Sequence, residues 1–188
     1  MIDVALLYIR DVIDQYLVTR LGVAGKSVIL HSLSSAESVQ FDTIRNKVVI
    51  TLIGLESEIN KQFYGGVRSE VSQVAHVNPP VYFNLGILIS VNFDDYAEAL
   101  KQLTCVIEFF QATPSLDRVN HPAMPAGLTA LKFEIENSPS EKMHNVWTAL
   151  GVNYLPSIIY KVRQVVVQSG QVTGKSAVVQ EVPGVVVS

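Results

Sequence analysis

The feature that most constrains the fold is a strand-to-helix transition between Pro79 and Pro114, PPVYFNLGILISVNFDDYAEALKQLTCVIEFFQATP. From Val81 to Val91 the residues are nearly all apolar, with only Asn84 and Ser90 polar, which is typical of a strand buried on both faces. After Phe93 the apolar residues recur every three or four positions, which is typical of an amphipathic helix. A buried strand followed directly by such a helix predicts a sheet covered by helices.

The helix that follows carries signals at both ends and one apolar residue off its main stripe. The oxygens available to cap its start belong to Asn92, Asp94 and Asp95, and Thr113-Pro114 ends it. We predict a stripe facing the sheet made of Tyr96, Leu100, Leu103, Ile107 and Phe110. Phe109 lies on a flank away from that stripe. A large apolar group there predicts a second partner, so we expect a subunit interface that contains Phe109, Cys105 and Gln102.

Composition favours a protein that is buried in an assembly. Hydrophobic residues make up 48% of the 188 residues and charged residues only 16%, against about 25% charged in ordinary soluble domains. Because soluble monomers rarely expose large apolar patches, we expect oligomerisation or incorporation into a larger particle. The net charge of −3 and the absence of basic clusters argue against a nucleic-acid partner, and no apolar run is long enough to predict a membrane span or signal peptide.

The remaining pattern predicts one α/β (α+β) domain with a mixed sheet covered by amphipathic helices. The expected helices are Ile2–Leu21, ended by Gly22, and a second one before Gly151. The expected strands besides the central one are Val28–Leu33, Val48–Leu55, Leu128–Glu136 and Ser157–Gln168. We assign residues 1–168 to the domain and 169–188, rich in valine and glycine, to an extended C-terminal tail.

Two polar segments are expected to be loops. One is Ser34–Thr43. The other, Glu56–Asn78, is unusually long for a structureless segment in a compact domain, so we predict that it contacts another chain. The residues that we expect to face a tube end or a ring lumen are Lys61, Tyr64, Gly65, Gly66 and Arg68.

No motif in the sequence predicts catalysis, a cofactor or a metal. Two Gly-Lys-Ser tripeptides, at 25–27 and 174–176, lack the earlier glycine and the strand–helix context of a phosphate-binding loop. The four histidines are far apart, and the single cysteine, Cys105, provides neither a disulfide nor a zinc site. Asp94-Asp95 is better explained by helix capping than by a catalytic carboxylate pair.

Two stretches resemble a known family, NLGILISVNFDDYAEALKQLTCVIEFFQATP (84–114) and WTALGVNYLPSIIYKVR (147–163). They are similar to the N-terminal domain of the cap, or tail-terminator, proteins of extracellular contractile injection systems, typified by the antifeeding prophage and the Photorhabdus virulence cassettes. The resemblance implies a structural, non-enzymatic protein. It implies a hexameric ring that closes the distal end of the inner tube and the last sheath layer, in a particle assembled in the cytoplasm and then released.

The resemblance also implies that the last sheath layer has extended arms, which we expect the cap to receive as added strands. The last predicted strand is long, β-prone and free of proline, so we expect it to be the receiving edge. The residues expected to meet the arm are Ile158, Tyr160, Val162 and Gln164. Two alternatives remain open at this point, an assembly chaperone of such a particle and a small-ligand-binding α/β domain.

Overall fold

The computed structural model describes residues 1–22, 25–33, 39–58, 66–70, 73–77, 80–167 and 172–177. Its helices are α1 (Ile2–Leu21), α2 (Val39–Ile44), α3 (Tyr96–Ala112) and α4 (Ser140–Leu150). Its strands are β1 (Val28–Leu30), β2 (Lys47–Ser57), β3 (Gly66–Glu70), β4 (Gln73–Val77), β5 (Val81–Asn92), β6 (Ser115–Asp117), β7 (Ala130–Ile135), β8 (Ser157–Val167) and β9 (Val172–Ala177).

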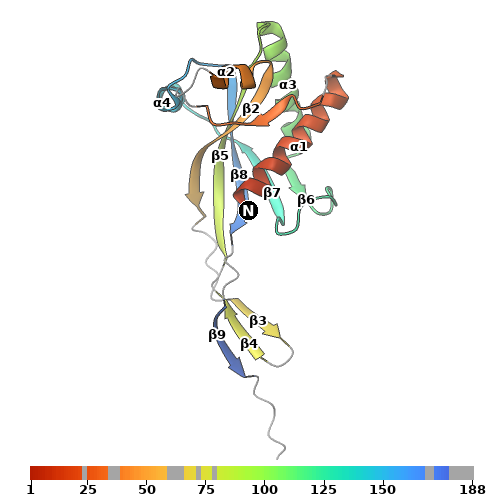
Figure 1. Ribbon diagram of the computed structural model, residues 1–188, viewed down its shortest axis with the longest axis vertical. Coiled ribbons are helices and arrows are strands. Elements are labelled where there is room, and N and C mark those ends of the chain that lie inside the picture. The colour runs from red at the N-terminus through yellow and green to blue at the C-terminus, as the bar shows by residue number, and fades with distance from the viewer. Residues whose placement is uncertain are drawn as a thin grey trace, which may run out of the picture.

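Six strands form one mixed sheet in the order β1-β2-β5-β8-β7-β6. β1 pairs with β2 in parallel, and the other neighbours are antiparallel, so the predicted mixed α/β architecture is confirmed. A second sheet has the order β3-β4-β9 and lies beyond one end of the long strands of the first sheet (Figure 1).

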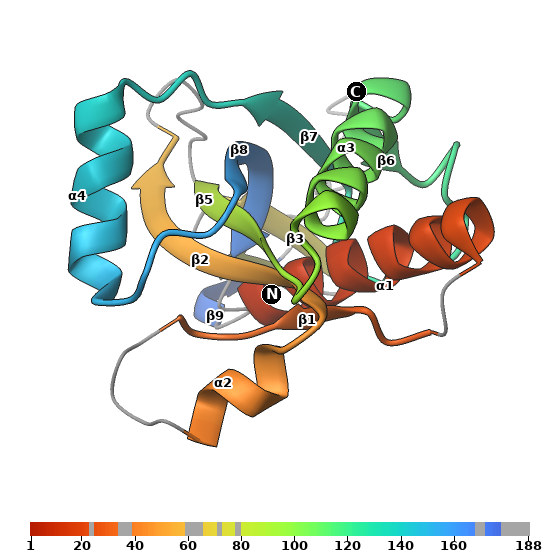
Figure 2. The same ribbon diagram turned by 90° about the horizontal axis from the view of Figure 1, so that it is seen from above.

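Helices cover the two faces of the six-stranded sheet to different extents. α1 and α3 pack on one face, and α4 lies on the opposite side (Figure 2). The larger core joins Ile9 and Ile13 of α1 and Val106 of α3 to the sheet, and the smaller one packs Trp147 of α4 against Leu88 and Ile159. The helices therefore bury apolar side chains of both faces, as expected for a central strand that is apolar throughout.

The predicted ends of the two long helices are confirmed. α1 spans Ile2–Leu21, and Gly22 follows in the left-handed conformation with φ of 65°, which glycine adopts without steric cost. At the start of α3 the Asp95 carboxylate accepts a hydrogen bond from the N–H of Ala97 at 3.0 Å. Capping is thus the role of Asp95, while Asp94 forms an ion pair with Arg45 at 2.9 Å.

The predicted buried stripe of α3 was wrong in part. Tyr96 and Leu100 are 65% and 42% exposed, whereas Gln102, Cys105 and Phe109 are buried. The reason is that α1 packs against the flank of α3, so α3 buries a face between α1 and the sheet instead of one directed at the sheet alone. The spacing of apolar residues along α3 gives no information on where α1 lies.

Segments predicted to be loops contain regular structure in their described parts. The segment 34–43 includes the start of α2, and Glu56–Asn78 includes the antiparallel pair β3–β4. Within the predicted tail, β9 pairs with β4 of the same chain. These elements have only five or six residues each, too few to show an apolar period, and β3, β4 and β9 form a separate small sheet.

Candidate interaction surfaces

The longest open edge in the described part of the six-stranded sheet belongs to β2. β1 is the end strand and pairs only with Val48–Ile50, while β2 has eleven residues. Among the described residues, β2 from Leu52 to Ser57 pairs on one side only, with β5. A strand edge of this kind presents main-chain N–H and C=O groups to which another extended segment can pair.

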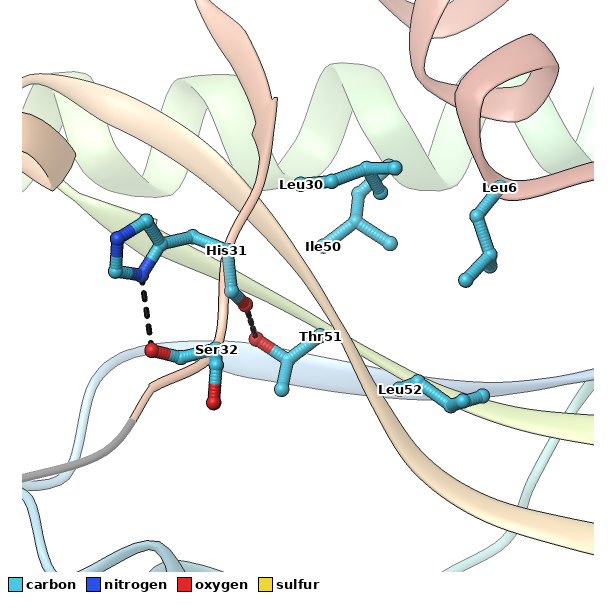
Figure 3. A pocket seen from close by; sticks show the side chains of 7 residues that line it. All are labelled: Leu6, Leu30, His31, Ser32, Ile50, Thr51 and Leu52. Carbon is cyan, nitrogen blue, oxygen red and sulfur yellow. Dashed lines mark hydrogen bonds between the residues drawn. The ribbon is translucent and has the colours of Figure 1, made fainter. Parts of the chain in front are cut away.

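A side chain ends the β1–β2 ladder at the start of this edge. The N–H of His31 still donates to the carbonyl of Ile50 at 3.1 Å, but the carbonyl of His31 then accepts from the Thr51 hydroxyl at 2.8 Å. The Nδ1 atom of His31 lies 2.9 Å from the carbonyl oxygen of Ser32 (Figure 3). The chain therefore leaves the sheet after His31, and β2 continues without it.

A cavity of about 300 Å³ lies where β1 leaves β2. Leu6 of α1 faces Leu52 across it, and Leu30 and Ile50 lie beside each other on the adjoining strands (Figure 3). The other lining residues are His31, Ser32 and Thr51. The arrangement suits an apolar side chain that enters beside the edge of β2.

Exposed apolar side chains continue this surface along the sheet. Leu52, Leu55 and Val81 are 41%, 47% and 46% exposed. Leu55 pairs with Leu85, a core residue, so it belongs to the face that α1 covers further along the strand. We name Leu52–Ser57 together with this cavity the β2 edge surface.

A second, charged cavity of about 370 Å³ opens among β2, β5, β7 and β8, lined by Glu56, Ser57, Glu58, Asn84, Glu134, Lys161 and Arg163. Arg163 bridges Glu58 at 3.0 Å and Glu134 at 3.1 Å, and Lys161 pairs with Glu56 at 2.6 Å. The hydrogen bond from Lys161 lowers the pKa of Glu56, and the same contact raises the pKa of Lys161. We name these residues the charged cavity.

The structure places the predicted subunit-interface residues inside the chain. Gln102, Cys105 and Phe109 are 1%, 6% and 4% exposed. Phe109 has its second partner within the same chain, because its ring contacts Tyr16 of α1. Burial raises the pKa of the Cys105 thiol, in keeping with a core position. The sequence predicted these side chains on a subunit interface, whereas they lie in the core of the single chain.

The predicted docking strand is not an edge. β8 lies between β5 and β7, so its ladder bonds are engaged on both sides where β7 runs beside it. Tyr160 and Val162 are core residues, Ile158 is partly buried, and the side chain of Gln164 lies outside the described residues. A strand that comes last in the sequence can be central in the sheet, which length and composition do not reveal.

Of the predicted tube-facing residues, Lys61, Tyr64 and Gly65 lie outside the described residues. Gly66 and Arg68 belong to β3, so they are in a strand and not in a loop. Their contact with another chain stays a prediction.

The two Gly-Lys-Ser tripeptides are part of the fold. At Gly25-Lys26-Ser27 the backbone N–H of Lys26 and the Ser27 hydroxyl donate to the carboxylate of Asp14, and the second tripeptide lies in β9. In the described part of the chain, no His, Cys, Asp and Glu side chains group into a metal site. Of the helices described, none combines the length and apolarity needed to cross a bilayer.

The β2 edge surface was not predicted from the sequence. The strand itself was predicted. Its open edge arises because β1 is short, and Leu52 and Leu55 are exposed because of where α1 and β1 end in the folded chain. The charged cavity was missed because its residues come from four strands that are far apart in the sequence.

Comparison with known proteins identifies similar folds. A family model described as the Pvc16 N-terminal domain matches residues 7–181.

The fold is similar to a structure described as the PVC sheath/tube terminator in its extended state, with a TM-score of 0.58, 15% identity, and coverage of 96% of this chain and 62% of that one. It is also similar to the anti-feeding prophage tube-terminating cap, with a TM-score of 0.57, 12% identity, and coverage of 95% and 60%. This chain thus spans less than two thirds of either structure's length. No curated protein matches it.

Proposed function

The chain belongs to the family of Pvc16 N-terminal domains, and on this basis we propose that it is a structural cap of a phage-tail-like contractile injection particle. In this role it closes the distal end of the inner tube and the last layer of the sheath. The observation that carries the proposal is the likeness of nearly the whole chain to a sheath/tube terminator and to a tube-terminating cap. The role is structural and not enzymatic.

We propose further that the cap is a homohexamer. A tube built of sixfold rings is closed most simply by a ring of the same symmetry, and a closed ring leaves no heterologous surface open to polymerise. The low charged fraction of 16% supports burial in such an assembly. With Phe109 in the core, the ring contacts use surface residues, among which Tyr96 and Leu100 of α3 are exposed apolar candidates.

The β2 edge surface replaces β8 as the proposed receiving edge for extended sheath arms. Its main-chain groups from Leu52 onward are unpaired on one side among the described residues, and its sequence contains no proline. The neighbouring cavity and the exposed Leu52 and Leu55 suit the alternating apolar side chains of an added strand.

In this proposal the protein is assembled in the cytoplasm and leaves the cell as part of the particle, in contact with inner-tube and sheath subunits. An assembly chaperone would share the fold but would be absent from mature particles. The test is therefore made on the purified particle.

The experiment combines quantitative mass spectrometry of purified particles with electron cryo-microscopy of their ends. We expect one ring of this chain per particle, with density at one tube end that fits the six-stranded sheet, and a hexamer in native mass spectrometry of the isolated protein. If the chain is present during assembly but missing from mature particles, the cap function is wrong and the chaperone function is favoured.

A further inference from the structure

The small sheet β3-β4-β9 stands apart from the helices that the structure describes. Those helices all lie around the six-stranded sheet, and the small sheet extends beyond it (Figure 1). Its strands have only five, five and six residues. A sheet of so few short strands normally needs a helix or further strands against it to be stable. The described part of the chain does not supply such a partner, so the small sheet calls for one from outside.

Both outer strands of the small sheet have an open edge in the described part of the chain. β4 lies in the middle and pairs with β3 on one side and with β9 on the other. Neither β3 nor β9 contains proline, so every residue of both strands has a main-chain N–H group. Open edges of this kind bind another extended strand.

The directions of the two edges fit a ring of identical copies. β3 and β9 are both antiparallel to β4, so they run parallel to each other. Rotation about a ring axis preserves the direction of a strand along that axis, so β9 of one copy meets β3 of the next in parallel. Because the two edges are different strands, each copy still has its own β3 free for the copy on its other side. Head-to-tail contacts of this kind generate closed rings.

The charges of the two outer strands favour one register. Arg68 pairs with Ala75, and Ala75 pairs with Lys175, so Arg68 and Lys175 share one row of the sheet. Without a stagger between copies, Lys175 would lie beside Arg68 of the partner subunit, and like charges on adjacent strands are destabilising. Closing strands into a barrel requires a stagger, and an even offset keeps each face of the sheet continuous. An offset of two residues places Lys175 beside Glu70 of the partner subunit, which has the opposite charge.

We propose that β9 of one copy pairs in parallel with β3 of the next, so that the small sheets of a ring join into one β-barrel. Six copies of a three-stranded sheet give a barrel of eighteen strands, about 30–40 Å across. Each contact pairs the open main-chain groups of both edges, and the closed barrel has no free edge. The inference rests on the proposed homohexamer and names one of its contacts.

Disulfide crosslinking in purified particles tests this pairing. One variant combines Lys175→Cys with Glu70→Cys, and a second combines Lys175→Cys with Arg68→Cys. Within one chain β4 separates β3 from β9 by about 10 Å, too far for a disulfide, and the native Cys105 is buried. We expect oxidation of the first variant to give a ladder of bands that ends at the hexamer on a non-reducing gel. Its yield should exceed that of the second variant by about fivefold or more, because the stagger moves the second pair beyond disulfide distance.

The matched control combines Lys175→Cys with Asp11→Cys on α1, where the native side chain is 62% exposed. It should give no ladder. A ladder from the Arg68→Cys variant alone supports the pairing of β9 with β3 and changes only its register. Crosslinks from both β3 variants no stronger than the control, in particles that contain the chain, overturn the inference and leave the cap function standing.

Electron cryo-microscopy of particles with the unmodified chain gives a second measurement. We expect density for a closed barrel in which β9 and β3 of neighbouring copies lie side by side. Density in which either strand pairs with a sheath or tube strand instead overturns the inference, although the chain is still a cap. Absence of the chain from mature particles overturns the inference and the cap function together.

Discussion

The rings of Tyr16 and Phe109 lie 5.3 Å apart between centroids, with 55° between their planes, and join α1 to α3. Phe109 also contacts Phe110 at 5.0 Å, and Phe110 contacts Tyr160 of β8 at 4.3 Å. The aromatic contacts thus run from one helix through the other to the centre of the sheet. Tyr160 is so enclosed that burial raises its pKa to about 12.

Replacing Phe109 by alanine should therefore destabilise the single chain. We expect Phe109→Ala to lower the free energy of unfolding by about 3–5 kcal/mol, because it removes a buried ring and leaves a cavity. Leu100→Ala, on the exposed face of the same helix, should cost less than about 1 kcal/mol. Urea denaturation followed by circular dichroism measures both. Equal midpoints for Phe109→Ala and the unmodified protein, together with loss of oligomers, would restore Phe109 to a subunit interface.

Asp14, inside the second half of α1, ties this helix to the start of β1, and Asp14→Asn should loosen this connection. Its carboxylate accepts from the backbone N–H groups of Lys26 at 2.9 Å and Val28 at 3.0 Å. An amide keeps one acceptor oxygen but presents N–H donors in place of the other, so one of these two N–H groups loses its partner. We therefore expect a loss of about 1–3 kcal/mol in the free energy of unfolding, measured at pH 7. An unchanged stability would mean that solvent replaces these bonds without cost.

The same carboxylate predicts a pH dependence. Burial raises the pKa of Asp14, but the hydrogen bonds from Lys26, Val28 and Ser27 outweigh it and leave the pKa below its ordinary value. A lowered pKa in the folded state contributes stability above about pH 4, the unfolded value, which is lost as pH falls through the folded pKa. The stability difference between the unmodified protein and Asp14→Asn should therefore shrink below about pH 4 in a series of urea titrations.

The β2 edge surface predicts a variant that folds but does not dock. Leu55 is 47% exposed, so Leu55→Lys should change stability by less than about 1 kcal/mol. A charge on the edge strand should nevertheless oppose strand addition and reduce co-purification with sheath by about tenfold. Val119→Lys, at a position 93% exposed, is the matched control. Normal co-purification of Leu55→Lys would exclude this edge as the docking site.

Gly127 has a φ of 96°, a backbone conformation that residues with a side chain rarely adopt. A Cβ atom there would also lie 2.6 Å from Cε of Met1, although that side chain is able to move. We expect Gly127→Ala to lower the free energy of unfolding by about 1–3 kcal/mol through backbone strain, visible as a lower thermal midpoint. An unchanged midpoint would show that this connection relaxes freely.

Local sequence signals predicted the long elements well. The extent of α1, the cap at Asp95 and the strand β5 follow from spacing, capping oxygens and apolar runs, because each depends on residues close together in the chain. Short elements were missed because β3, β4, β6 and β9 are too brief for a period to show. The family resemblance, carried by residues 84–114 and 147–163, agrees with the family match over residues 7–181.

Tertiary structure decided which of these residues are available to partners. β8 is the last long strand in the sequence but a central one in the sheet, and Phe109 is off the predicted stripe of its helix but buried by α1. The open edge arises because β1 stops after Leu30 while β2 continues to Ser57, and the charged cavity arises where four strands meet. The sequence of a segment determines where its apolar and polar residues lie along a helix or strand. Whether those residues are exposed depends on which other segments pack beside them, and this packing is set by contacts between residues distant in the chain.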